Sequence, residues 1–494
     1  MRGSFLRLPA SAAFVALFAT ACATNPATGK RQISLVGERQ EVEMGREAAE
    51  EVGTAIGLYT APQLNTYVGT VGRRLAAASE RPQLDWSFQV VDDPAVNAFA
   101  LPGGYIYVTR GLLAHLNSEA ELAAVLGHEI GHVTARHSVN QISRTQLATL
   151  GLGVGMILKP ELRRFGQLGE AGLGLLMLKY GRDDENQADE LGLRYMTKAN
   201  YDPRAMPDVM HMLGRVSESD NTGRVPNWLS THPNPTDREE RVTTKISQQH
   251  LGGTTVQPEA YLRRIDGLVF GADPREGVFR ENVFYHPEMA FQMEFPRGFE
   301  TQNQKQAVGA ISTQRDAVLV VTLTGRGSAD AAAREFFAQA GVERGGRWRD
   351  SIHGLPTVSY EFAASAGQVP VRGLAAFVEH NGHVFQILGY SATPVWSRYD
   401  NVFEDSIESF ARLTDRRYLN IEPLRLKIVP ASRLTSLDEI ARNSPVDRRT
   451  LQLINGVEGS SMEARPFVKT IVGDELAIEI MRDQTRRRSA RDDG

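Results

Sequence analysis

A single cysteine, Cys22, is present among the 494 residues of the chain. One cysteine cannot form a disulfide within the chain, so no disulfide staples the fold and large hydrophobic cores must supply its stability. The cysteine also stands at the end of an N-terminal leader, which excludes it as the nucleophile of a folded enzyme.

Long apolar runs and an excess of positive charge are also absent. No apolar stretch reaches the about 20 residues that a membrane-spanning helix needs. The chain has 55 Lys and Arg against 59 Asp and Glu, a net charge of −4, so a nucleic-acid partner is not expected. A hydrophobic content of 41% is that of ordinary globular domains. The length predicts about two to four of them.

Residues 1–22, MRGSFLRLPASAAFVALFATAC, have the pattern of a secretory signal. Two arginines precede an apolar stretch of about a dozen residues, too short for a membrane span. The ending Ala-Thr-Ala-Cys resembles a bacterial lipobox, which implies lipidation of Cys22 and an outer-membrane anchor facing the periplasm. A lipobox usually has Leu where Ala19 stands, and Ala-Thr-Ala also fits ordinary signal cleavage. A soluble periplasmic or secreted form is therefore the alternative.

The stretch AVLGHEIGHV, residues 124–133, places three polar side chains in an apolar run. Four residues cover about 400° of helix, so His128 and His132 lie one turn apart on one face and can share a metal ion. Glu129 points about 100° to the side and can reach a water on that metal. An S-x-x-E capping box at 118–121 starts the helix. The pattern favours a zinc site over a pair of exposed histidines.

A zinc hydrolase needs a third protein ligand and an open position for water. In YGRDDENQADELGLRYM, residues 180–196, acidic residues occupy the first turn of a predicted helix, and Glu185 and Asp189 are four apart. Taken alone, such a helix start is typical of a solvated face. Together, H-E-x-x-H and a distal E-x-x-A-D resemble the M48 family of metallopeptidases. The resemblance implies that Glu185 is the third ligand and that Asp189 supports the site.

The resemblance implies a mechanism and a cofactor. One zinc ion per chain would be held by His128, His132 and Glu185, and would lower the pKa of its water. Glu129 would take the proton as that water attacks a peptide carbonyl, and would pass it to the leaving amine. The expected substrates are proteins or peptides.

The segment VNAFALPGGYIYVTRGLL, residues 96–113, reads as a strand, a Pro-Gly-Gly turn, a second strand and a helix start. Family members have a similar N-A-F-A-x-P-G-G segment. This likeness implies that a strand at the lip of the cleft binds an extended peptide through main-chain hydrogen bonds. An ordinary hairpin is the alternative. The predicted substrate-binding residues are Asn97, Ala98, Phe99, Ala100 and Leu101.

The loop STHPNPTDREER, residues 230–241, matches the family's H-P-x-x-x-x-R pattern. The resemblance places His232 and Arg238 near the active site as catalytic groups. His232 could stabilise the oxyanion, or it could gate the site by occupying the open position of zinc. A plain His-Pro loop is the alternative.

Two glycine-rich apolar segments lie between the metal motifs, at 147–158 and 171–180. They are 12 and 10 residues long, too short to span a membrane. Buried helices or a lid over the cleft are expected, with contact to a bilayer surface as the alternative.

The C-terminal half has a different texture. Residues 275–415 contain alternating runs, including a hairpin around Asn381-Gly382, and predict a small α+β domain without catalytic groups, its scattered histidines at the surface. Residues 420–475 resemble a LysM module, which implies binding of peptidoglycan. This copy has Pro-Ala-Ser where Gly-Asp-Thr is usual. The charged tail, 482–494, is predicted to be disordered.

The predicted fold is therefore α+β and multidomain. A mainly helical, zincin-like metallopeptidase core with a small edge-strand sheet spans 30–250, followed by the α+β domain and the LysM-like module. The predicted function is cleavage of misfolded or unassembled proteins of the bacterial envelope. The alternatives are a chaperone-like scaffold that rarely cuts and a peptidoglycan-binding protein with a vestigial peptidase.

Overall fold

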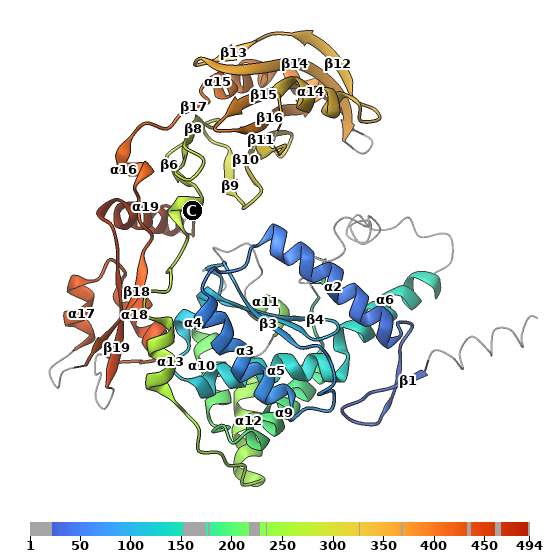
Figure 1. Ribbon diagram of the computed structural model, residues 1–494, viewed down its shortest axis with the longest axis vertical. Helices are drawn as coiled ribbons and strands as arrows, with labels where there is room; N and C mark the ends of the chain where they lie inside the picture. The colour runs from blue at the N-terminus through green and yellow to red at the C-terminus, as the bar shows by residue number, and fades with distance from the viewer. Residues whose placement is uncertain are drawn as a thin grey trace, which may run out of the picture. The chain divides into compact units, whose positions relative to one another are not determined.

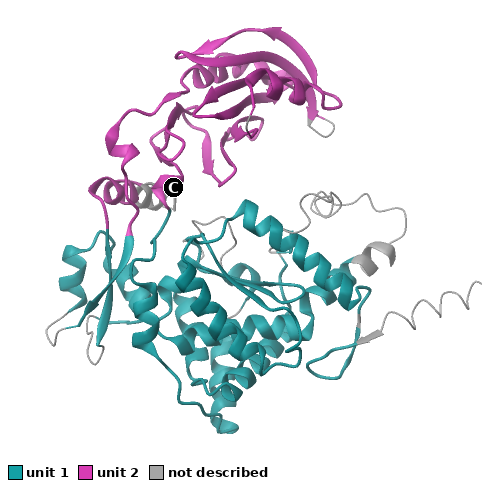
Figure 2. Cartoon of the chain, in the orientation of Figure 1, with its two compact units in different colours: residues 1–272, 425–472 teal, residues 273–424, 473–494 magenta. Residues whose placement is uncertain are grey.

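The computed structural model describes residues 22–151, 174–175, 178–216, 228–233, 235–325, 327–366, 369–431, 436–459 and 466–492. They form two compact units (Figure 1, Figure 2). Unit 1 comprises residues 1–272 and 425–472, and unit 2 comprises residues 273–424 and 473–494. Each unit contains helices and sheet strands, so the multidomain α+β prediction is confirmed at this level.

Helices make up most of the N-terminal part of unit 1. Several of them bury an apolar face, as α3 does with Val68, Val71 and Leu75. The helices are α2 (Glu38–Ala55), α3 (Pro62–Ala76), α4 (Arg110–His115), α5 (Glu119–Ala135), α6 (His137–Gly151), α9 (Arg182–Lys198), α10 (Ala205–Arg215), α11 (Trp228–Thr231), α12 (Pro235–Gln248) and α13 (Pro258–Ile265).

A three-stranded sheet accompanies these helices. Its order is β3 (Ser87–Val91), β5 (Tyr105–Thr109) and β4 (Ala98–Leu101), so β4 is an edge strand. β4 and β5 form the predicted hairpin, and Gly103 and Gly104 in its turn have φ values of 80° and 102°, which glycine adopts without strain. The chain then enters α4 directly, as predicted.

Helices α5 and α9 pack closely because small residues face each other. A Cβ on Gly131 would lie 2.9 Å from Ala188 O, and a Cβ on Gly127 would lie 3.3 Å from Gly192 Cα. Side chains larger than hydrogen at these two positions of α5 would push the helices apart. The close approach lets residues of both helices reach the same point.

The N-terminal arm, defined here as residues 22–33, is a hairpin of β1 (Cys22–Thr24) and β2 (Arg31–Ile33). It is held to α6, where Asn140 Nδ2 donates to Gln32 Oε1 at 2.8 Å. Just after the arm, Leu35 N donates to Ser143 Oγ at 3.0 Å.

Residues 425–472 complete unit 1 with β18 (Arg425–Pro430), α17 (Leu437–Asn443), α18 (Arg448–Asn455) and β19 (Phe467–Val472). β18 pairs antiparallel with β19. Lys469 is 1% exposed, and its Nζ donates to Ala114 O, Leu116 O and Ile454 O at 2.5 to 2.9 Å. This lysine joins the C-terminal segment to the end of α4.

Unit 2 is built on an eight-stranded antiparallel sheet of order β12-β14-β15-β16-β11-β10-β9, with β13 beside β14. Its strands are β9 (Glu300–Asn303), β10 (Ala307–Ile311), β11 (Ala317–Leu323), β12 (Glu343–Arg347), β13 (Ser351–Ile352), β14 (Leu355–Ala366), β15 (Val369–His380) and β16 (His383–Ala392). Helices α14 (Ala329–Phe337) and α15 (Asp400–Glu408) pack on it. A smaller sheet has the order β17 (Ala411–Arg412), β8 (Phe291–Glu294), β7 (Val283–His286) and β6 (Val278–Arg280). The short helix α16 (Arg416–Leu419) follows it.

In the C-terminal half, the structure confirms the predicted turn but differs from the predictions for His380 and the tail. Asn381 and Gly382 have φ values of 49° and 76°, as a type I′ hairpin requires. His380 was expected at the surface but is 5% exposed, because its Nε2 lies 2.8 Å from Ala290 O. The predicted disorder of the tail is wrong up to Asp492, since α19 (Glu475–Asp492) is helical. Its first turns are anchored by buried apolar residues, and the arginines that follow are good helix formers.

Membrane-related expectations fall partly outside the described residues. The leader, residues 1–21, lies there, as do residues 152–173 between the metal motifs. Residues 147–151 continue α6. Among the helices of the described stretches, none has the length and hydropathy to cross a bilayer.

Candidate metal centre

Two histidines of α5 form one side of the site. His128 and His132 lie one turn apart, and their Nε2 atoms are 3.0 Å from each other. His128 Nδ1 lies 2.9 Å from Asp189 Oδ1. Because an ionised carboxylate only accepts hydrogen bonds, His128 Nδ1 donates and the lone pair of its Nε2 faces His132.

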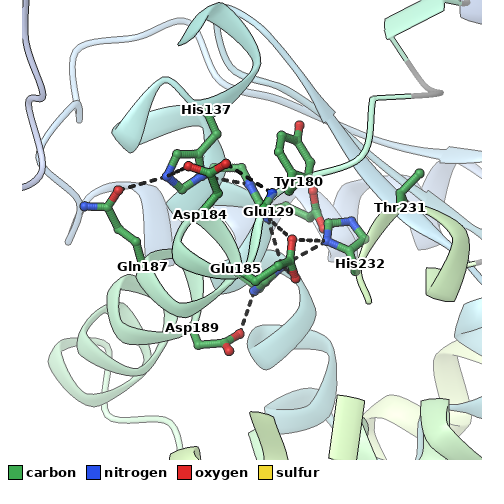
Figure 3. Close-up of polar contacts among 12 residues, drawn as sticks. Glu129, His137, Tyr180, Asp184, Glu185, Gln187, Asp189, Thr231 and His232 are labelled. Carbon is green, nitrogen blue, oxygen red and sulfur yellow. Dashed lines mark hydrogen bonds and ion pairs between the residues drawn. The ribbon is translucent and has the colours of Figure 1, made fainter. Parts of the chain in front are cut away.

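Glu185, in the first turn of α9, faces the two histidines. Its Oε1 lies 3.4 Å from His132 Nε2, and its Oε2 lies 3.7 Å from His128 Nε2. Figure 3 shows this carboxylate beside the ring of His232. The close packing of α5 on α9 thus brings all three predicted ligands together.

His232, directly after α11, adds a fourth donor to the group. Its Nδ1 lies 2.9 Å from Glu185 Oε1 and 3.3 Å from His128 Nε2 (Figure 3). The ring stacks on Trp228 with 4.0 Å between centroids. The sequence predicted three ligands and an open position, whereas the structure gathers four donors.

The four residues fit a zinc ion. One donor atom from each of His128, His132, Glu185 and His232 lies within 4.8 Å of the others, and each residue is at most 3% exposed. Facing lone pairs of buried imidazoles repel each other unless a proton or a cation lies between them. Four imidazole and carboxylate donors around one point are typical of a zinc site.

Arg238, at the start of α12, joins the two carboxylates of α9. Its Nη1 lies 2.5 Å from Glu185 Oε2, and its Nη2 and Nε lie 2.6 and 3.0 Å from Asp189. Burial would raise the pKa of Glu185, but the neighbouring His232 and Arg238 hold it well below its usual value. Burial would also raise the pKa of Asp189, but Arg238 and His128 lower it below its usual value. Both carboxylates therefore remain ionised as acceptors.

Glu129 lies beside this group without belonging to it. The residue is 0% exposed, and its Oε1 is 3.7 Å from His232 Nε2. Among the described residues neither carboxylate oxygen has a hydrogen-bond partner. Burial raises the pKa of the Glu129 carboxyl to about 7, which a nearby cation would lower. An orphaned buried carboxylate next to metal donors is suited to taking a proton from water.

Aromatic rings pack against the histidines of the site. Tyr180 stacks on His132 at 3.9 Å, and its backbone N donates to Thr231 O at 3.4 Å. Residues Asn97 to Leu101, the predicted substrate strand, are each at most 8% exposed. Just before them, Val96 O accepts from Trp228 N at 3.0 Å. The side chains of this strand are therefore packed inside the fold.

Comparison with known proteins relates one part of the chain to a family. Residues 62–246 match the model of peptidase family M48. This part of the chain is an M48 peptidase domain. M48 enzymes are metallopeptidases, which agrees with the donor cluster.

Relatives of the M48 domain come from bacteria and mitochondria. "Mitochondrial metalloendopeptidase OMA1" of Arabidopsis thaliana is 40% identical over 32% of this chain and 31% of its own length. "Putative beta-barrel assembly-enhancing protease" of Vibrio cholerae is 35% identical over 36% and 38%. "Beta-barrel assembly-enhancing protease" of Yersinia pestis is 29% identical over 47% and 50%. The chain thus covers half or less of the length of these three relatives.

The M48 domain contains all the predicted site residues except Cys22, which lies in β1 of the N-terminal arm. Sequence reasoning missed His137, whose Nδ1 lies 2.9 Å from His132 Nδ1. Residues five apart in a helix lie on different faces, so the spacing of His132 and His137 did not predict a contact between them. The two rings meet only because the helix breaks at Arg136, a break that the sequence does not signal.

Proposed function

We propose that this protein is a zinc-dependent endopeptidase of the bacterial cell envelope. The observation that carries the proposal is the convergence of His128, His132 and Glu185 beside the buried carboxylate of Glu129, inside an M48 domain. A zincin-like arrangement of α5 and α9 around the ion is part of this proposal.

The residues of the chain divide the chemistry among them. His128, His132 and Glu185 would hold zinc, which supplies Lewis-acid activation of water and of the scissile carbonyl when bound. Glu129 accepts the proton of the attacking water and donates it to the leaving amine, so no covalent acyl-enzyme forms. Arg238 and Asp189 keep the ligands ionised and oriented through the ion pairs described above.

The envelope location rests on the leader and on the relatives. Cys22 ends a secretory signal that resembles a lipobox, which supports a lipid anchor in the outer membrane, with a soluble periplasmic form as the alternative. Relatives named beta-barrel assembly-enhancing protease support substrates among misfolded or unassembled envelope proteins.

The LysM-like segment supports a second contact with the envelope. Residues 425–472 run strand, helix, helix, strand, with the two strands paired. This order agrees with the resemblance, and we propose peptidoglycan as its ligand. Binding of the purified protein to isolated peptidoglycan sacculi, measured by co-sedimentation, would test this part.

The test of the main proposal combines metal content with proteolysis. The full mature chain should hold one zinc ion and digest an unfolded envelope protein. His128→Ala, His132→Ala and Glu185→Ala should each lose most of the zinc. Glu129→Gln should keep the zinc and lose activity by about 10²-fold or more, because only the proton acceptor is gone. A wild-type protein without zinc, or full activity in Glu129→Gln, would overturn the proposal.

A further inference from the structure

His137 is held against the outer side of a metal donor. Helix α5 ends at Ala135, its cap residue Arg136 has a left-handed φ of 61°, and α6 begins at the next residue. The side chain of Arg136 is fixed by a hydrogen bond from Nε to the buried Glu41 Oε2 at 2.7 Å. The resulting turn places His137 Nδ1 2.9 Å from His132 Nδ1, on the ring edge that points away from the cluster.

Gln187 decides which nitrogen of His137 carries the proton. Its Oε1 lies 2.9 Å from His137 Nε2 (Figure 3), and Asp184 Oδ1 lies 3.7 Å from the same nitrogen. Both oxygens can only accept, so in the neutral ring Nε2 carries the hydrogen and Nδ1 presents a lone pair. That lone pair can only accept a hydrogen bond from His132 Nδ1. His132 is thereby left with a lone pair on Nε2, directed at the metal donors.

Asn25 extends the same hydrogen-bond chain into the N-terminal arm. Its Oδ1 accepts from Ala27 N and Thr28 N at 2.9 and 3.2 Å, so the amide nitrogen must face the other way. That nitrogen lies 3.3 Å from Ala135 O and 3.4 Å from Gln187 Oε1. A donor from Asn25 thus reaches this Gln187 atom, which makes it the amide oxygen and an acceptor for His137.

We propose that His137 and Gln187 are positioning residues that hold His132 in its metal-binding tautomer. The hydrogen-bond chain from Gln187 through His137 to His132 is called the relay below, and Asn25 connects it to the N-terminal arm. The inference rests on the proposed function for its purpose, because a fixed Nε2 lone pair matters only if a metal is bound there. Partners that orient metal-binding histidines typically contribute 10- to 100-fold to metal affinity.

Zinc affinity of the full mature chain, measured by competition with a chromophoric chelator, tests the relay. His137→Leu removes the acceptor and should weaken zinc binding about 10- to 100-fold. His137→Asn places an oxygen where Nδ1 stood and should restore most of the affinity. The matched control is His115→Leu, which removes another hydrogen-bonded histidine, 2.8 Å from Gly111 O and outside the cluster. Equal affinities of His137→Leu and the control would overturn the inference.

The link to the arm is tested by two further variants. Gln187→Leu should weaken zinc binding as His137→Leu does, whereas Gln187→Glu keeps an acceptor and should not. Asn25→Ala should show a smaller loss, of several-fold, because Gln187 keeps its bond to His137. Wild-type affinity in Asn25→Ala would remove the arm from the relay.

Histidine-ring ¹⁵N NMR of the metal-free protein separates this inference from the proposed function. The relay requires His132 with its proton on Nδ1 and His137 with its proton on Nε2. The opposite tautomers would overturn the relay even in a protein that binds zinc. A wild-type chain that binds no zinc would overturn the proposed function, while the tautomers would still test the relay.

Discussion

At the scale of single residues, two roles are possible for His232, a gate on the metal site or a group that stabilises the oxyanion, and they exclude each other. With its Nδ1 in the donor cluster, His232 completes four donors, and a tetrahedral zinc ion would have no position left for water. Stacking on Trp228 and the contact with Glu185 hold the ring in that place. The geometry of this state therefore favours a gate over an oxyanion-stabilising group.

His232→Ala decides between these roles by the sign of its effect. As a gate, its removal should raise basal digestion of an unfolded substrate, since water gains a position on the metal. As a group that stabilises the oxyanion, its removal should lower kcat by about 10² or more. Single-turnover proteolysis by wild type and variant at equal zinc content makes the comparison. An unchanged rate would leave His232 as an ordinary loop residue.

His115 makes unit 1 sensitive to acid at a place remote from the chemistry. Burial lowers the pKa of His115 to about 4, while its ring Nδ1 donates to Gly111 O at 2.8 Å. In the unfolded chain the pKa is about 6.5. As the pH falls from about 6.5 to about 4, the unfolded state binds a proton that the folded state excludes. The free energy of unfolding should therefore drop, by up to about 3 kcal/mol.

His115→Asn isolates this contribution, because the amide can donate to Gly111 O but does not titrate. Urea unfolding at pH 7.5 and at pH 4.5, followed for both proteins, should show a smaller acid loss in the variant. Equal losses would assign the acid sensitivity to other groups.

At the scale of elements, the sequence was most informative where the signal was local. The cap of α5 forms as predicted, with Glu121 N donating to Ser118 Oγ at 3.1 Å. The β4–β5 hairpin and the Asn381-Gly382 turn also follow from a few neighbouring residues. Contacts such as Asn25 to Gln187 join residues far apart in the chain, and no periodicity encodes them. The contact of Asn25 with Gln187 could not be predicted for that reason.

The close contact between α5 and α9 predicts that adding one methyl group at Gly131 destabilises the fold. Gly131→Ala would place a Cβ 2.9 Å from Ala188 O, so the helices must separate. The expected cost is about 1–3 kcal/mol, with weaker zinc binding because Glu185 moves away from the histidines. Gly53→Ala is the matched control in α2, since nothing lies within 4 Å of its Cβ, and it should be neutral or stabilising. Thermal unfolding and zinc titration of both variants measure this, and equal behaviour would contradict the packing argument.

At the scale of the whole molecule, the anchor at Cys22 would set where the peptidase works. The arm that begins at Cys22 reaches the relay residue Asn25 within three residues. We expect Cys22 to incorporate a labelled fatty acid in a bacterial host and the protein to sediment with outer membranes. Cys22→Ala should abolish both. An unlabelled, freely soluble mature chain would favour ordinary cleavage after Ala21.

The division into two units also predicts how the chain unfolds. The sequence suggested separate peptidase and LysM-like segments, yet residues 425–472 share unit 1 with the M48 domain. Lys469 is central to this joining, because its buried ammonium donates to carbonyls of both segments, Leu116 O and Ile454 O. Such a contact is not readable from a sequence in which the partners stand more than 350 residues apart.

Lys469→Met should loosen the C-terminal segment from the M48 domain. Three buried carbonyls lose their donor, and leaving buried acceptors unpaired costs about 1–3 kcal/mol. The matched control is Lys427→Met in β18, whose exposed ammonium pairs with Asp266 at 3.0 Å and should matter by less than about 1 kcal/mol. Hydrogen exchange should then show β18 and β19 opening before α5 in Lys469→Met, but together with it in wild type and control. Independent opening already in the wild type would mean that the segment is a separate domain resting on the peptidase.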